Sequence, residues 1–373
     1  MNTNAPATLP APARRPLAAL FALTLTLALA PACVISNAAG GGAAAAPAGL
    51  QLELIKTRRI WDGGSHNAFT DLIQWHGRWW CSFRESTAHV GGDGRVRVLV
   101  SRDGEKWKTI KLLSVAGVDM RDPKFSITPD DRLMINCGGS YYDGQNLTGR
   151  VSLALFSSDG ATWTNPRTIA GDREWLWRVT WHDGIAYGAA YNGFLREGGK
   201  AVSSLVLYNS KNGLDWTPVG PMPVNGRDKP NETTLRFEKD GRMLALVRRE
   251  AGDQKGWVGR SAPPFTEWMW QTSNYRFGGQ NLLQLDTGEW IVGTRDYSNM
   301  KIAGSWHGAA YLLARLMDDG RLEPLLKLPS GGDCSYPGLA QAGDEIWTTY
   351  YSSHEGKASV FLAKIKIKRP SAQ

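Results

Sequence analysis

The stretch "SSDGATW", residues 157–163, places a serine, an aspartate, a glycine and a tryptophan within seven residues. The same arrangement returns as "SRDGEKW" at 101–107 and "SKNGLDW" at 210–216, and a degenerate copy, "SAPPFTEW", lies at 261–268. Successive copies begin 56, 53 and 51 residues apart. A repeat of this length is typical of propeller blades and other stacked supersecondary units, so we expect a chain built from repeats.

Each copy follows a run of β-branched and apolar residues, such as "VSLALF" before Ser157, and therefore predicts a hairpin turn. In this turn Asp159 is expected to accept hydrogen bonds from backbone N–H groups, with Trp163 anchoring the hairpin against its blade. Six further hairpins are predicted at "WHGRWWCSF", "PDDRLMIN", "WHDGIAYGA", "EKDGRMLAL", "LDTGEWIVG" and "QAGDEIWTT".

The pattern predicts an all-β protein: a six-bladed β-propeller with four antiparallel strands in each blade. The apolar stretch "LQLELIK" at 50–56 is expected to supply the outer strand of the last blade and so close the ring. The alternative, a pair of β-sandwiches, predicts no fixed repeat.

The N-terminal region is typical of an export signal. Arg14 and Arg15 precede an apolar run that is too short to span a membrane and ends near Cys33. We predict a signal peptide at 1–33, a Gly/Ala-rich linker at 34–49 and the propeller domain at 50–373, with export to the periplasm, the cell surface or the medium. Two kinds of processing remain open: cleavage at an A-x-A-like site, or a lipid anchor on Cys33.

The net charge is +8 at pH 7 and is not gathered into basic runs. This distribution favours an anionic ligand such as an acidic sugar over nucleic acid, for which a basic stripe is expected. Cys81, Cys137 and Cys334 lack the spacing of a zinc site; buried free thiols are the favoured interpretation, with one disulfide as the alternative. No metal or other cofactor is predicted, and the chain is expected to be a monomer.

Counting seven residues on from the glycine of three inner hairpins reaches Arg84, Arg248 and Arg295, and the same count in blade three reaches Tyr191. Because inner strands of a propeller surround the central axis, the three guanidinium groups are predicted to meet on one carboxylate. The alternative is that each arginine pairs with an acid close to it in the chain.

The starts of the first strands of three blades offer the complementary groups Asp122, Glu232 and Tyr336. An acid can take the proton of a phenol, and nearby arginines are expected to lower the phenol's pKa. For Tyr336 a buried core position is the other interpretation.

These segments resemble the sialidase (neuraminidase) superfamily over most of the chain after the linker. "SRDGEKW" and "SSDGATW" look like the family's Asp-boxes, each one residue shorter than usual. "NETTLRFEKDGRMLALVR" is similar to the segment that joins the catalytic glutamate to a substrate-binding arginine, which implies those roles for Glu232 and Arg248. "SYPGLAQAGDEIWTTYY" resembles the segment of the catalytic tyrosine, here Tyr336, and "CSFRES" implies a substrate-binding role for Arg84.

The resemblance implies an exo-glycosidase that hydrolyses a terminal acidic sugar such as sialic acid. Tyr336, activated by Glu232, would attack the anomeric carbon, a known exception to the carboxylate nucleophile of glycosidases. The loop after Arg84 reads "ESTAHVGGDG" and offers His89 and Asp93 as the acid/base.

Two other functions stay open. His89 with Tyr336 or Tyr191 could act as base and acid of a polysaccharide lyase, or of a glycosidase acting on uronic-acid or rhamnose-containing polymers. A propeller that binds glycans without catalysis could use Trp177 and its neighbours Trp175 and Trp181 as a stacking platform. For these tryptophans, packing between blades is the alternative.

Overall fold

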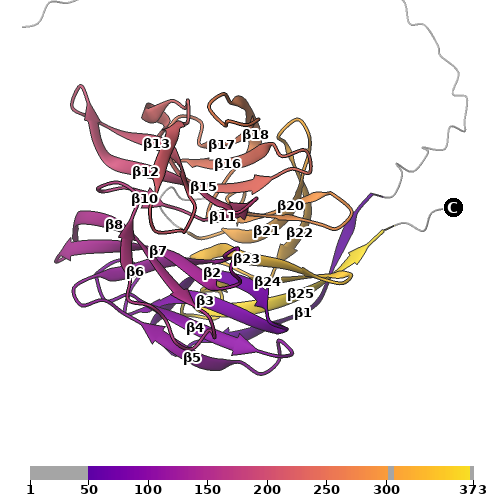
Figure 1. Cartoon of the computed structure of the whole chain (residues 1–373). Helices are drawn as coiled ribbons and strands as arrows, with labels where there is room; N and C mark the ends of the chain where they lie inside the picture. The colour runs from indigo at the N-terminus through magenta and orange to yellow at the C-terminus, as the bar shows by residue number, and fades with distance from the viewer. Residues whose placement is uncertain (1–48, 301–305, 370–373) are drawn as a thin grey trace, which may run out of the picture. The chain divides into compact units, whose positions relative to one another are not determined.

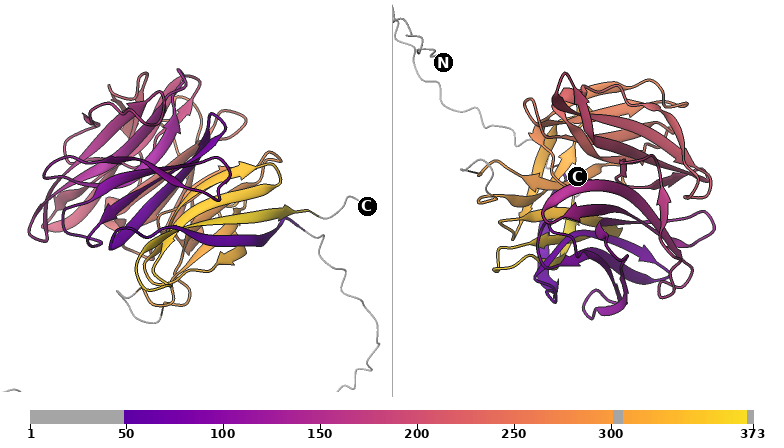
Figure 2. Two further views of the ribbon diagram at one scale, coloured as in Figure 1. Left: turned by 90° about the horizontal axis from the view of Figure 1, so that it is seen from below. Right: turned by 90° about the vertical axis from the view of Figure 1, so that its left-hand side faces the viewer.

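The structure is a computed structural model and describes residues 49–300 and 306–369. Its strands form six antiparallel sheets arranged as the blades of a propeller around a common centre (Figures 1 and 2). This confirms the predicted fold. The one helical element among the described residues is a short 3-10 turn, η1 (Gly226–Asp228).

The first three blades follow one another along the chain. Blade one comprises β2 (His66–Trp75), β3 (Arg78–Ser86), β4 (Arg95–Ser101) and β5 (Lys108–Leu113). Blade two comprises β6 (Asp119–Ile127), β7 (Leu133–Asp143), β8 (Asn146–Ser157) and β9 (Arg167–Ile169). In blade three the innermost strand is interrupted, and the blade comprises β10 (Trp175–Leu176), β11 (Thr180–His182), β12 (Ile185–Glu197), β13 (Lys200–Ser210) and β14 (Thr217–Pro221).

The last three blades complete the ring. Blade four comprises β15 (Pro230–Phe237), β16 (Met243–Arg249), β17 (Lys255–Ser261) and β18 (Met269–Arg276). Blade five comprises β19 (Asn281–Gln284), β20 (Trp290–Asp296), β21 (Ala310–Leu316) and β22 (Leu322–Leu328). Blade six comprises β23 (Cys334–Ala342), β24 (Glu345–Ser352), β25 (Ser359–Lys368) and β1 (Gln51–Trp61).

Blade six joins the two ends of the propeller domain. The first strand, β1, pairs antiparallel with the last, β25, along most of its length, from Gln51 opposite Lys368 to Trp61 opposite Val360. Figure 1 shows indigo β1 lying beside yellow β25. The segment at 50–56 therefore supplies the outer strand of the last blade, as predicted, and its backbone groups satisfy the edge that β25 would otherwise expose.

The repeated turns connect the two outer strands of their blades. Asp159 Oδ1 accepts hydrogen bonds from two backbone N–H groups of its own turn, at 2.7 and 2.8 Å, and Trp163 Nε1 donates to the carbonyl of Gly160 at 3.0 Å. The turns at 101–107 and 210–216 make the same set of bonds. The predicted structural role of Asp159 is confirmed.

The innermost strands of several blades carry a β-bulge at the same place. In β2, β6 and β23 the bulge contains a non-glycine residue with positive φ: Phe69 at 62°, Asp122 at 51° and Tyr336 at 53°. A left-handed residue is strained and redirects its side chain out of the regular strand alternation. The bulges thus aim Phe69, Asp122 and Tyr336 differently from their strand neighbours.

Cys81, Cys137 and Cys334 are buried free thiols on strands of the sheets, which confirms the favoured interpretation. Among the described residues no helix is long and apolar enough to cross a membrane. The signal peptide at 1–33, nearly all of the linker at 34–49 and the anchor at Cys33 lie outside the described residues and stay predictions.

Candidate active site

One pocket of about 380 Å³ is lined by residues from inner strands and loops of several blades. The residues proposed from the sequence that line it are His89, Asp122, Tyr191, Glu232, Arg248 and Tyr336. They come from blades one, two, three, four and six, so the propeller gathers side chains that are up to 247 residues apart.

Tyr336 and Glu232 form the centre of the site. The Tyr336 hydroxyl donates a hydrogen bond of 2.6 Å to Glu232 Oε1, and Arg248 Nη1 lies 3.0 Å from the same hydroxyl and 2.5 Å from Oε1. Burial raises the pKa of the Tyr336 phenol well above its usual value, and the nearby charge of Arg248 opposes the rise without cancelling it. The arginines lower this pKa, as expected, but burial is the larger effect, so the pKa is raised overall.

Gly279 helps to hold this pair. Its backbone N–H donates to Glu232 Oε2 at 3.2 Å, and its φ of 60° lies in the left-handed region. A Cβ added at this glycine would stand only 2.3 Å from the ring of Tyr336. Glycine is therefore required for the backbone to approach both side chains at once.

The Tyr336 ring is held by aromatic neighbours. Phe69 lies edge-on at 5.0 Å between ring centroids, and Trp177 lies at 5.9 Å, also edge-on. Trp177 is only 2% exposed and is not among the residues that line the pocket, so it packs behind the nucleophile candidate. Trp175, two residues earlier, is the tryptophan that lines the pocket.

Asp122 combines burial with an incomplete set of partners. It is 5% exposed and lines the pocket, and its Oδ1 has no hydrogen-bond partner among the described residues. Burial raises the pKa of Asp122 to about 6, although the charges of Arg121 and Lys124 oppose the rise. A carboxyl group with this pKa can give and take a proton near neutral pH.

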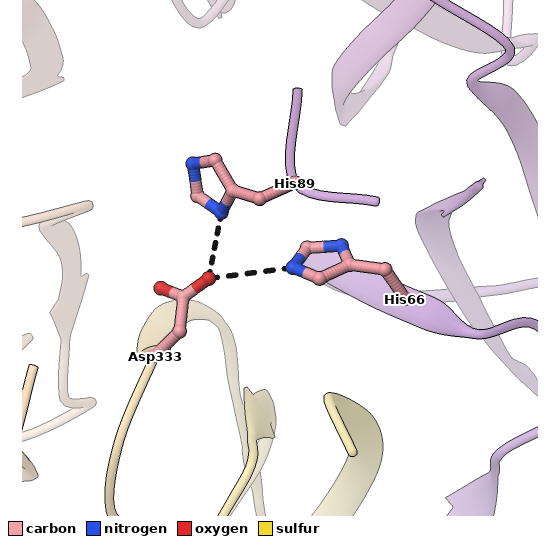
Figure 3. Close-up of side chains that lie close together, drawn as sticks. All are labelled: His66, His89 and Asp333. Carbon is pink, nitrogen blue, oxygen red and sulfur yellow. Dashed lines mark hydrogen bonds and ion pairs between the residues drawn. The ribbon is translucent and has the colours of Figure 1, made fainter. Parts of the chain in front are cut away.

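His66, His89 and Asp333 form a cluster beside the pocket (Figure 3). His89 Nδ1 lies 2.7 Å and His66 Nε2 3.3 Å from Asp333 Oδ2. Burial alone would raise the pKa of Asp333, but hydrogen bonds from the two histidines and the charge of Arg295 hold it well below its usual range. The carboxylate only accepts, so both rings donate to it, and the Nε2 of a neutral His89 is left as an acceptor.

These three residues are the one group of three or more metal-ligating side chains found among the described residues. Their ligand atoms lie within 4.8 Å of one another. Imidazole nitrogen and carboxylate oxygen are ligands that zinc accepts. The hydrogen bonds between the three groups account for their arrangement without an ion.

Asp93 is the other acid/base candidate from the same loop. Its Oδ1 accepts hydrogen bonds of 3.1 Å from both the backbone N–H and the hydroxyl of Thr87. Burial is the largest single effect on its pKa and raises it, but the hydrogen bonds and the charge of Arg84 together outweigh burial and leave the pKa lowered. Asp93 does not line the pocket, and a carboxyl group held in its charged form is a poor proton donor.

Two of the three arginines donate their hydrogen bonds to groups other than Tyr336 and Glu232, although the Arg295 guanidinium carbon lies 5.6 Å from the centroid of the Tyr336 ring. Arg84 forms a bidentate pair with Asp119 at 2.7 and 2.9 Å, and both side chains are fully buried. Arg295 donates to the carbonyl of Cys334 at 2.6 Å and lies 3.3 Å from Asp333. The structure therefore places Arg84, Arg248 and Arg295 on different carboxylates.

Several buried polar atoms on the pocket wall have no hydrogen-bond partner among the described residues. Besides Asp122 Oδ1, they include Ser140 Oγ, Arg150 Nε, Trp175 Nε1, Asn231 Oδ1 and Arg248 Nε. Buried polar groups in proteins are normally paired, and each unpaired one costs about 1–3 kcal/mol. A concentration of both donors and acceptors on one wall is what a ligand with many hydroxyl groups would satisfy.

Sequence reasoning missed Phe69, Arg150 and Asp333. Nothing in the local sequence distinguishes Phe69 and Arg150, because their roles depend on contacts between blades. For Asp333 a signal was available: it is an acid two residues before "SYPGLAQAGDEIWTTYY", the segment from which Tyr336 was identified.

No family model matches the sequence, and no curated protein matches it. Solved structures do match the fold. A protein of unknown function from Dyadobacter fermentans superposes with a TM-score of 0.75 at 16% identity, covering 85% of this chain and all of that chain.

Two enzymes are among the structural neighbours. Trypanosoma rangeli sialidase has a TM-score of 0.63 at 12% identity, with 84% of this chain covered but only 58% of the sialidase. An α-L-arabinofuranosidase mutant from Fusarium graminearum, solved with an iminosugar inhibitor, has the same TM-score and identity and is covered over 98% of its length. At these identities the comparisons support the propeller fold, which glycoside hydrolases of two specificities share with this chain.

Proposed function

We propose that the protein is a glycoside hydrolase that removes a terminal acidic sugar with retention of configuration. The observation that carries the proposal is the contact between Tyr336 and Glu232, joined by Arg248, in a pocket with unpaired polar atoms. Tyrosine is an established glycosidase nucleophile when a carboxylate can take its proton.

In the first step the Tyr336 oxygen attacks the anomeric carbon while its proton passes to Glu232, 2.6 Å away. The raised pKa of the phenol means that the attacking group starts neutral, so proton transfer accompanies attack. Asp122 gives its proton to the departing glycosidic oxygen, and the bond from the anomeric carbon to that oxygen breaks. Arg248 stabilises the negative charge that develops on the phenol oxygen.

In the second step a water molecule attacks the anomeric carbon of the glycosyl-tyrosine. Asp122, now a carboxylate, takes the water's proton, and Glu232 returns its proton to the leaving phenol oxygen. Both side chains are then restored to their starting states. Two displacements at one carbon give net retention.

An acidic sugar is supported by the nucleophile and by the charge of the pocket. A neutral phenol does not repel an anionic substrate, whereas a carboxylate nucleophile would. Four cations line the pocket against three carboxyl groups: Arg121, Arg150, Lys229 and Arg248 against Asp122, Glu232 and Glu250.

The test uses aryl glycosides of sialic acid, of hexuronic acids and of neutral hexoses. We expect release of the aryl group from an acidic glycoside, and loss of that release in Tyr336→Phe. Full activity of the folded variant would remove Tyr336 from the mechanism, and turnover of neutral glycosides alone would contradict the acidic substrate.

A second candidate function is eliminative cleavage of a uronic-acid polymer. The contact that favours it is the 2.7 Å bond between His89 and Asp333, which fixes the ring and leaves Nε2 as a base at the pocket wall. Elimination creates a double bond that absorbs in the ultraviolet, whereas hydrolysis does not, so a spectrum of the products separates the two.

Export belongs to the same proposal. The leader at 1–33 is expected to direct the chain across a membrane, where polymeric glycans are accessible. The mass of the mature protein decides between the two kinds of processing: a lipid-bearing N-terminus at Cys33, lost in Cys33→Ala, or an unmodified cleaved terminus.

A further inference from the structure

The wall of the pocket between blades two and three presents donors that no described residue accepts. Ser140 of β7, Arg150 of β8 and Trp175 of β10 all line it. Ser140 pairs across the sheet with Arg150, and Trp175 is only 4% exposed. Ser140 Oγ, Arg150 Nε and Trp175 Nε1 are buried and have no hydrogen-bond partner in the part of the chain that the structure describes.

Two of these groups determine which kind of ligand atom can pair with them. Guanidinium and indole N–H groups only donate, so the partner must present acceptors. Arg150 forms no ion pair with any described carboxylate, unlike Arg248, which pairs with Glu232 and Glu250. Its positive charge therefore makes an anionic acceptor, a carboxylate, the best match.

Aromatic rings hold Arg150 without using its donors. The guanidinium carbon lies 5.2 Å from the centroid of the Trp175 ring and 5.6 Å from that of Phe194. Trp175 is itself stacked nearly parallel to Tyr191, at 9° and 6.2 Å. A cation placed over ring faces keeps its N–H edge available, so the side chain is positioned in advance for a bidentate contact.

One glycine makes room for the indole at this wall. A Cβ added at Gly138 would lie 2.2 Å from the Trp175 ring, so only glycine lets the indole lie against β7.

The position of this wall bears on which acidic sugar fits. A carboxylate attached to the anomeric carbon must lie beside Tyr336, where Arg248 is already neutralised by Glu232 and Glu250 and Arg295 by Asp333. The unpaired guanidinium belongs instead to the wall of blades two and three. A carboxylate at another ring carbon is therefore the better match.

We propose that Ser140, Arg150 and Trp175 form a subsite for the carboxylate of a hexuronic acid, carried on a ring carbon other than the anomeric one. The subsite rests on the proposed function, which places an acidic sugar in this pocket. It narrows the substrate class from acidic sugars in general to uronic acids.

The test is calorimetric binding of methyl glucuronide and methyl galacturonide, each against its neutral methyl glucoside or galactoside, to the full chain. One of the two uronides should bind at least about tenfold more tightly than its neutral partner, the ratio expected for a charge-assisted contact. Arg150→Gln should abolish the difference, and Trp175→Phe, which keeps an aromatic ring and removes the N–H, should reduce it.

Arg173→Gln is the matched control. Arg173 also lies over the Phe194 ring, at 5.4 Å, but it does not line the pocket, so its loss should leave the preference for the uronide unchanged. Equal preference in Arg150→Gln and wild type would overturn the subsite. So would a preference for a methyl sialoside over both uronides that Arg150→Gln leaves intact.

Binding separates failure of the subsite from failure of the proposed function. Arg150-dependent binding of a uronide without turnover of its aryl glycoside would keep the subsite and reject the hydrolase. Turnover that depends on Tyr336 but not on Arg150 would keep the hydrolase and reject the subsite.

Discussion

Asp122 and Tyr336 occupy the same place in two different blades: each is the left-handed residue of the bulge in its blade's innermost strand. Their φ angles are 51° and 53°, and the strand register shifts at both positions. Strain of this kind is kept where surrounding structure supports it and often marks a functional site. Here it brings an acid with a raised pKa and a buried phenol to one pocket.

Replacing Asp122 by asparagine should stabilise the protein at pH 8 while abolishing activity. The folded pKa of Asp122 is about 6 and the unfolded value 3.8, so the folded state binds more protons between these values. The free energy of unfolding therefore falls by about 3 kcal/mol as pH rises from below 3.8 to above 6. Asparagine carries no charge at any of these pH values, so the variant avoids this loss. Urea unfolding of both proteins at pH 5 and pH 8 measures the difference.

The control is Asp119→Asn, which should have the opposite effect. Asp119 holds the buried guanidinium of Arg84, and removing one partner of a buried ion pair costs about 3–5 kcal/mol. Equal destabilisation by both substitutions at pH 8 would contradict the raised pKa of Asp122.

The same pKa predicts the alkaline side of the pH profile. Asp122 must carry its proton to protonate the leaving group, so kcat/KM should decline as pH rises above about 6. A very acidic aryl leaving group departs without being protonated. With such substrates the rate of the first step should no longer depend on the protonation of Asp122. An unchanged profile for both kinds of leaving group would assign the acid role to another residue.

Tyr336→Phe should lower kcat by on the order of a thousandfold or more, because the nucleophile is removed while its packing is kept. Tyr350→Phe is the matched control: this buried tyrosine donates to the carbonyl of Pro329, outside the pocket lining. Its loss should cost about 1 kcal/mol of stability and leave kcat within a few-fold of wild type. Comparable rate losses in the two variants would mean that loss of a buried hydroxyl's hydrogen bond, not loss of the nucleophile, lowers the activity.

Asp159→Ala should lower the melting temperature without changing kcat, because Asp159 accepts backbone hydrogen bonds in a turn remote from the pocket lining. Those bonds lower the pKa of Asp159 to about 2 from 3.8. The stabilisation is complete above pH 3.8 and disappears as pH falls toward 2, where variant and wild type should converge. Melting curves at pH 7 and pH 2.5 check this: the gap should be smaller at pH 2.5, and a gap as large as that at pH 7 would be the contrary result.

His89→Gln distinguishes the hydrolase from the lyase. In the hydrolase mechanism His89 transfers no proton, so the variant should retain kcat within about tenfold and form products without ultraviolet absorption. If His89 were the base for elimination, the variant would lose turnover and the wild-type products would absorb.

The fold could be predicted because each repeated turn is specified locally. The bonds made by Asp159 and Trp163 lie within one turn, so a seven-residue motif is sufficient to locate the outer hairpins. The pairing of β1 with β25 is not local. It could still be predicted, because the apolar strand at the N-terminal end of the domain can pair with one free edge, the outer edge of the last blade.

The site was predicted only in part. Counting a fixed number of residues from the hairpin glycine ignores that the hairpin turns of different blades differ in length. Arg84 pairs with Ala68 beside the bulge of blade one, and the residue at that register in blade four is Arg249, opposite Pro230. The count reached Arg248 instead, since the turn between β15 and β16 is longer than that between β2 and β3. Neighbouring strand residues face opposite sides, so a difference of one residue separates a structural arginine from a pocket arginine.

The most direct test of the mechanism is covalent trapping with a fluorinated glycosyl fluoride of the acidic sugar that the enzyme cleaves. Fluorine beside the anomeric carbon slows the second step more than the first, so the glycosyl-enzyme accumulates and peptide mass spectrometry locates it. We expect one sugar on the peptide that contains Tyr336, with none in Tyr336→Phe. A sugar attached to Glu232 or Asp122, or steady turnover with no adduct on any residue, would contradict it.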